Sequence, residues 1–185
     1  MENMAKKRYS EDYEIIYTID EKGKEKQSTV YRGDYYEVAL DNEGLVKFKW
    51  NSFLVLAIII VLHIIAGFIN NPGLNHFYVI FPYIFAIFPI WYLGDSIFRL
   101  PNEKRKFRRK EIGLSFDRIK ASSNILLFLL AIGIISELIF LIFASGGEFF
   151  GLEFLYLALE LIISGAVYYQ IILHRQISIQ ITTKS

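Results

Sequence analysis

Four long apolar stretches, separated by shorter polar segments, constrain this chain more than any other feature. Each is long enough for a helix to cross the roughly 30 Å hydrocarbon core of a bilayer. Hydrophobic residues make up 54% of the chain and aromatic residues 16%, which is too apolar for a soluble protein of 185 residues. The sequence therefore predicts an all-α membrane protein built as a four-transmembrane-helix bundle. The predicted spans cover about residues 53–69, 77–98, 125–144 and 151–173.

All twenty Lys and Arg residues lie on one side of these four spans. Nine lie in residues 1–50, nine in the loop 99–120 and two after residue 173, whereas the turns 70–76 and 145–149 contain none. Segments rich in Lys and Arg remain on the cytoplasmic side of a membrane. We therefore expect a multi-pass protein with both termini and the basic loop in the cytoplasm and the two short turns outside.

The first fifty residues are polar and lack a secretory signal, so the first apolar stretch is expected to act as an uncleaved insertion signal. Frequent Ile, Phe, Lys and Asn favour an AT-rich bacterial genome, and hence the plasma membrane as the location.

Residues 1–50 are predicted to form a small cytoplasmic domain, a three-stranded β meander. Apolar and polar residues alternate from Tyr13 to Ile19, and further strand patterns follow at 28–32 and 35–40, with turn residues at 20–24. Residues 51–175 form the predicted transmembrane domain, including the basic loop, and residues 176–185 a cytoplasmic tail.

Ionisable residues inside the apolar stretches are the candidate functional site. His63, Glu137 and Glu160 fall near one depth, on the outer side of the bilayer midplane. Glu153 lies two helical turns outward of Glu160 on the same face, with Tyr156 between them. Such groups cost several kcal/mol in lipid unless they are partnered or hydrated, so they mark either a site or a packing contact.

Three interpretations of this polar layer remain open. In the first, Glu137 and Glu160 bind a proton or cation that enters past Glu153. In the second, His63, Glu137 and Glu160 hold zinc or iron, although neither an HExxH motif nor a Glu-x-x-His pair is present. In the third, His63 hydrogen-bonds to a carboxylate and fixes helix pairing.

The centre of the loop 99–120 is strongly basic and is predicted to bind anionic lipid headgroups, at about 1 kcal/mol per charge near the surface. A nucleic-acid partner is not expected, because the loop adjoins the bilayer and has no folded binding module. The predicted headgroup-binding residues are Lys104, Arg105, Lys106, Arg108, Arg109 and Lys110.

Neither a catalytic motif nor a cofactor motif is visible. The chain has no Cys, and it contains no glycine-rich phosphate loop and no nucleophile elbow. The leading hypothesis is a non-enzymatic accessory or regulatory subunit that binds a membrane-protein partner. The alternative is an oligomeric proton- or cation-coupled transporter or channel, since one four-helix bundle encloses little room. An intramembrane metalloenzyme is the third hypothesis.

Overall fold

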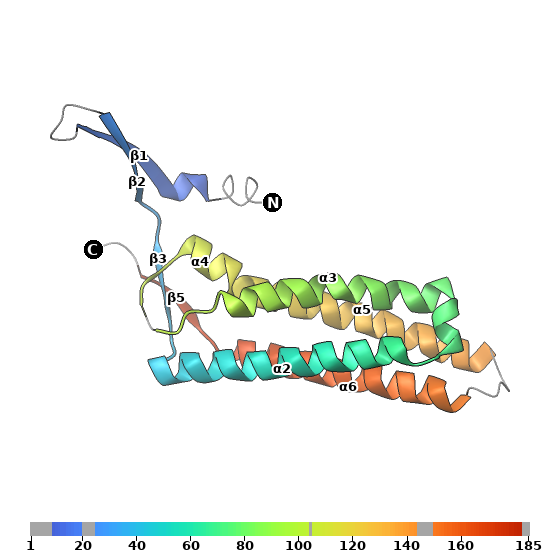
Figure 1. Ribbon diagram of the computed structural model, residues 1–185. Coiled ribbons are helices and arrows are strands. Elements are labelled where there is room, and N and C mark those ends of the chain that lie inside the picture. The colour runs from blue at the N-terminus through green and yellow to red at the C-terminus, as the bar shows by residue number, and fades with distance from the viewer. Residues whose placement is uncertain (1–8, 20–24, 104, 144–149, 183–185) are drawn as a thin grey trace.

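Four long helices dominate the fold and lie side by side in an elongated bundle (Figure 1). The computed structural model describes residues 9–19, 25–103, 105–143 and 150–182. Each of the four helices is long and apolar enough to span a membrane, which confirms the predicted number of long apolar helices. They are α2 (Asn42–Phe68), α3 (Phe77–Phe98), α5 (Phe116–Phe143) and α6 (Phe150–Arg175).

Helices α2 and α5 begin well before the predicted spans, so part of each lies in segments expected to be polar. At the start of α2, the Asp41 side chain accepts a hydrogen bond of 2.8 Å from the backbone N–H of Gly44, as an N-cap residue does. Leu45 follows and is buried. At the start of α5, Phe116 and Ile119 are fully buried. The apolar face of each helix thus continues beyond the bilayer-length stretch and packs on the neighbouring helices.

The strands near the N-terminus form, but the predicted three-stranded meander is wrong in its pairing. Strands β1 (Tyr13–Ile19) and β2 (Glu25–Tyr31) pair as an antiparallel hairpin. Strand β3 (Tyr35–Val38) belongs to a second sheet of order β4-β3-β5, between β4 (Phe107–Arg108) and β5 (Ile179–Thr182). The predicted turn at 20–24 lies outside the described residues.

Burial explains why β3 pairs with distant segments. Val38 and Phe107 are almost completely buried, and Tyr36 and Ile179 pack against the same core as the four helices. The sheet of β4, β3 and β5 therefore covers the end of the bundle at which α2 begins and α3 ends (Figure 1). Part of the predicted tail is thus strand β5, and the basic loop contains β4 and the short helix α4 (Arg109–Leu114).

The helices pack around the bundle in the order α3, α5, α6, α2, and among the neighbouring pairs α2 and α3 touch each other least. Between α6 and α2, in the half nearer the sheets, the Gln170 side chain donates a hydrogen bond of 2.9 Å to Ser52 Oγ. Both residues are fully buried. A second, smaller core lies around Ala66, Val79 and Phe140, toward the opposite end. That end holds the candidate site.

Candidate functional site

Three glutamates converge inside the half of the bundle that lies away from the sheets. Glu137 of α5 is completely buried, and Glu153 and Glu160 of α6 are only 3% and 4% exposed. The Glu137 and Glu153 carboxyl groups meet beside Gly73, where a Cβ atom would lie 2.9 Å from Glu137 Oε2 and 3.2 Å from Glu153 Oε2. Glu160 is close enough to Glu137 to interact electrostatically. We call Glu137, Glu153 and Glu160 the acidic cluster.

The turn between α2 and α3 closes the acidic cluster at the end of the bundle that lies away from the sheets. Here a 3-10 helix, η2 (Pro72–Asn75), begins after Asn71, a buried residue whose side-chain oxygen accepts a 2.6 Å hydrogen bond from Gly73 N–H. The same N–H lies 3.1 Å from Glu153 Oε1, and Asn71 Nδ2 donates to Glu137 Oε1 at 3.4 Å. The sequence indicated only a polar turn here, because its contact with α5 and α6 depends on the folded arrangement.

Tyr156 and Gly133 hold Glu160 against α5. The Tyr156 hydroxyl donates a hydrogen bond of 3.1 Å to Glu160 Oε1, and its side chain is fully buried. Gly133 lies one helical turn from Glu137, and a Cβ atom built on it would be 2.7 Å from Glu160 Oε1. The missing side chain of Gly133 therefore makes room for the carboxyl group.

Each glutamate of the acidic cluster has one buried oxygen, Oε2, without a hydrogen-bond partner. The ion pairs found among the described residues all involve other carboxylates, so none neutralises this cluster. Buried carboxylates without a cation are strongly unfavourable in a low-dielectric interior. A proton on one carboxyl turns an acceptor oxygen into a donor and satisfies a neighbouring oxygen as well. The arrangement is therefore chemically suited to holding protons.

His63 lies apart from the acidic cluster. Its ring stacks on Tyr83 at a centroid distance of 4.3 Å, and the Tyr83 hydroxyl donates a 3.0 Å hydrogen bond to the His63 backbone oxygen. Tyr83 in turn neighbours Tyr156, the residue that donates a hydrogen bond to Glu160. Among the described residues, no group of three His, Asp or Glu side chains is arranged to hold a metal ion. The structure therefore does not assemble the predicted metal ligands.

The basic loop residues fall into paired and unpaired sets at the sheet end. Arg105 forms an ion pair of 2.7 Å with Glu111, and Arg109 approaches Asp12 at 3.9 Å. Lys106, Arg108 and Lys110 are exposed. Lys104 lies outside the described residues.

Substituting Gly133 tests how tightly Glu160 is packed against α5. We expect Gly133→Ala to destabilise the protein by about 1–3 kcal/mol, because the new methyl group displaces the Glu160 carboxyl group. Gly165→Ala on α6 is the matched control, since a Cβ there meets nothing within 4 Å. Thermal unfolding in detergent, followed by circular dichroism, measures both variants. Equal melting temperatures for the two would contradict the packing described here.

The acidic cluster, with Tyr156, Asn71 and Gly73, is thus a buried group of carboxyl oxygens and donors drawn from α5, α6 and the turn between α2 and α3. The His63 ring instead stacks on Tyr83. Comparisons of this chain with protein-family models, with curated proteins and with solved structures return no match.

Proposed function

We propose that this protein is a non-enzymatic accessory subunit that binds a transmembrane helix of a larger membrane protein between α2 and α3. The observation that carries the proposal is an apolar groove of about 630 Å³ along this loosely packed seam. Several of its lining side chains are also exposed on the surface of the bundle, so the groove opens onto the lateral surface of the four helices. They are Ile60, Ile64, Ile87, Trp91 and Phe98.

A polar feature in the groove wall favours a protein helix over lipid chains as the occupant. His63 lines the groove, and its Nε2 atom is buried without a hydrogen-bond partner. An acyl chain offers no polar group, whereas a helix with Ser, Thr, Asn or Gln at this depth supplies one when the His63 ring turns to present Nε2 to the groove. Gly94, also in the lining, carries no side chain and lets a partner backbone approach closely.

The hairpin β1–β2 supports the same proposal from outside the bundle. It projects away from the four helices (Figure 1), and its Ile15 and Tyr17 side chains are 53% and 65% exposed. A two-stranded hairpin is only marginally stable alone in water. A partner that covers this apolar face would stabilise it and add a second contact to the helix in the groove.

The proposal includes an orientation with both termini, the sheets and the basic loop in the cytoplasm of a cell bounded by its plasma membrane. It is supported by the gathering of both sheets and the basic loop at one end of the bundle (Figure 1). Positive charge is retained on the cytoplasmic side during membrane insertion.

Site-specific photo-crosslinking in the native membrane tests the groove. A probe at Ile64 in the groove should give one dominant protein adduct, with the crosslink mapping to a transmembrane helix. A probe at Ile135, equally exposed but on α5, should not. Gly94→Leu fills the groove and should lower the yield several-fold, whereas Gly165→Leu, at a position facing open space, should leave it unchanged. Identical adducts from Ile64 and Ile135, or lipid adducts alone, would refute the proposal.

A second candidate function is an oligomeric proton- or cation-coupled transporter or channel. The specific observation in its favour is the acidic cluster, with three buried oxygens that lack partners. In proteoliposomes, wild-type protein should then conduct protons, alkali ions or divalent cations, and Glu160→Gln should abolish the flux while the protein still folds. Wild-type protein without any such flux eliminates this candidate.

A further inference from the structure

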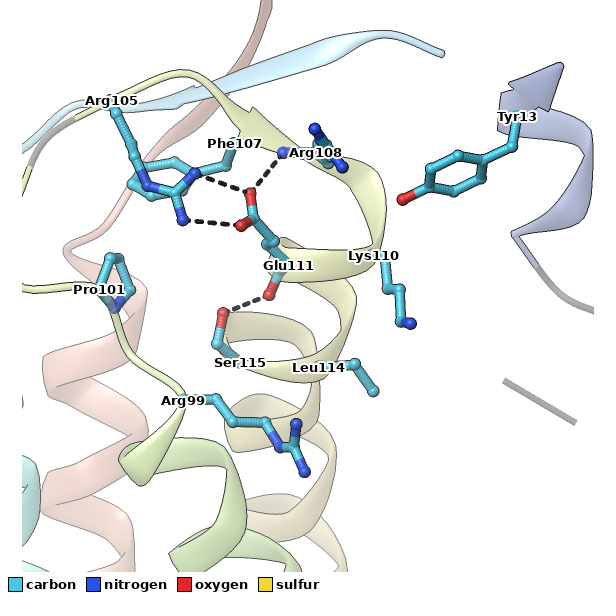
Figure 2. Close-up of a pocket in the computed structure, with 10 residues that line it drawn as sticks. All are labelled: Tyr13, Arg99, Pro101, Arg105, Phe107, Arg108, Lys110, Glu111, Leu114 and Ser115. Atoms are coloured by element: carbon cyan, nitrogen blue, oxygen red, sulfur yellow. Dashed lines mark hydrogen bonds and ion pairs between the residues drawn. The ribbon is translucent and has the colours of Figure 1, made fainter. Parts of the chain in front are cut away.

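A pocket of about 450 Å³ lies at the sheet end of the bundle, where α3 ends and α4 begins (Figure 2). Arg99 and Pro101 form one side, and α4 forms another. Tyr13, at the start of the hairpin, faces the pocket with its hydroxyl group (Figure 2). Tyr13 and the stretch 99–115, which are distant in sequence, thus enclose one basic space.

Positive charge in the pocket exceeds the negative charge that could neutralise it. Asp95 is shared between Arg99, at 2.9 Å, and Arg118, at 2.7 Å, so one carboxylate serves two guanidinium groups. Its hydrogen bond raises the pKa of Arg99 above the ordinary value, so this side chain stays cationic. Glu111 forms an ion pair of 2.7 Å with Arg105 and accepts a hydrogen bond from the backbone N–H of Arg108.

Arg108 and Lys110 provide charge that no carboxylate compensates in the described part of the chain. The Arg108 guanidinium lies over the Tyr31 ring, 5.4 Å from its centre, a contact that leaves its N–H groups free to donate. Lys110 is exposed and lines the pocket. An anion that enters the pocket therefore meets two unpaired cations together with the shared Arg99.

Apolar residues beside these cations distinguish a lipid from a soluble anion. Leu114 and Pro101 line the pocket. Phe98, the last residue of the membrane-spanning helix α3, is 70% exposed and directly precedes Arg99. The cationic groups thus lie at the end of an apolar surface, as a charged headgroup lies at the end of its acyl chains.

We propose that this pocket binds the phosphate headgroup of an anionic membrane lipid, with Arg108, Lys110 and Arg99 as the cationic partners and the Tyr13 hydroxyl as a donor. The loop sequence alone predicts diffuse attraction to an anionic surface, whereas the pocket predicts one saturable lipid per protein. The proposal does not rest on the partner helix between α2 and α3.

Native mass spectrometry of the full-length protein in a neutral detergent tests this site. The probes are dioctanoyl phosphatidate, dioctanoyl phosphatidylglycerol, dioctanoyl phosphatidylcholine and inorganic phosphate. We expect one saturable anionic lipid per protein and no comparable binding of phosphatidylcholine. The double variant Arg108→Ala/Lys110→Ala should bind dioctanoyl phosphatidate on the order of thirty-fold more weakly, because two charges near the headgroup are lost.

Lys47→Ala is the matched control, because Lys47 is exposed at the same end of the bundle and does not line the pocket. It should leave binding unchanged, and the melting temperatures of all variants verify that they are folded. Equal weakening by Lys47→Ala, unchanged binding by the double variant, or equal binding of phosphatidylcholine would overturn the proposal. Inorganic phosphate could also bind as tightly as phosphatidate and lose this binding in the double variant. That result would overturn the proposal that the phosphate group belongs to a lipid.

Discussion

Asn71→Asp is expected to destabilise the bundle by about 3–5 kcal/mol, the cost of an uncompensated buried charge. The substitution removes the amide group that donates to Glu137 Oε1 and places a fourth carboxyl group against the acidic cluster. The new side chain can still accept the hydrogen bond from Gly73 N–H, so the shape of the turn between α2 and α3 is kept. The loss therefore reports electrostatics within the site. Thermal unfolding in detergent, or unfolding by increasing mole fractions of dodecyl sulfate, measures it.

Asn75→Asp is the matched control, since Asn75 belongs to the same 3-10 turn and is exposed. We expect a change within about 0.5 kcal/mol, as for most surface substitutions. Adding Glu137→Gln to Asn71→Asp should restore much of the stability, because the amide and the carboxyl group then exchange positions. Similar small losses from both aspartate variants, or no rescue, would contradict the arrangement of the acidic cluster.

Removal of residues 177–185 is expected to lower the stability by about 3 kcal/mol or more, from the apolar surface that it exposes. The truncation deletes β5, the strand that pairs with all four residues of β3, and leaves β3 paired only with the two residues of β4. It also removes Ile177 and Ile179, which pack against the core beneath the sheet. Melting temperatures in detergent measure the effect.

Deleting only residues 183–185 provides the control, because it spares β5. This shorter truncation should leave the melting temperature close to that of the full chain. If both truncations melt alike, the C-terminal segment does not contribute to the fold in the way that the sheet requires.

The four helices were predictable because each apolar stretch is a continuous local signal of bilayer length. The sheet was not. Turn residues and alternation describe neighbouring segments, whereas Tyr36 of β3 pairs with Phe107 and with Ile181, both far along the chain. A strand of four residues carries too little pattern of its own to identify such partners. Burial of Val38 against the helices decides the pairing instead.

The candidate site, like the fold, was predictable from the sequence only in part. Position along each apolar stretch predicted a similar depth for His63, Glu137 and Glu160, because depth follows from the rise per residue. Depth says nothing about the direction in which a side chain leaves its helix, and Tyr83 lies against His63 and next to Tyr156. Position along the chain could not reveal that the His63 ring stacks on Tyr83.

The amino-acid sequence alone was sufficient for the mostly helical class and for the number of long apolar helices, since these depend on hydrophobicity summed along short segments. Only the tertiary structure decided that Asn71 and Gly73 complete the acidic cluster, that β3 joins the C-terminal segment, and that α2 and α3 leave a groove. These features depend on the rotation of each helix about its axis and on how side chains from distant segments fit together. Packing in three dimensions determines both.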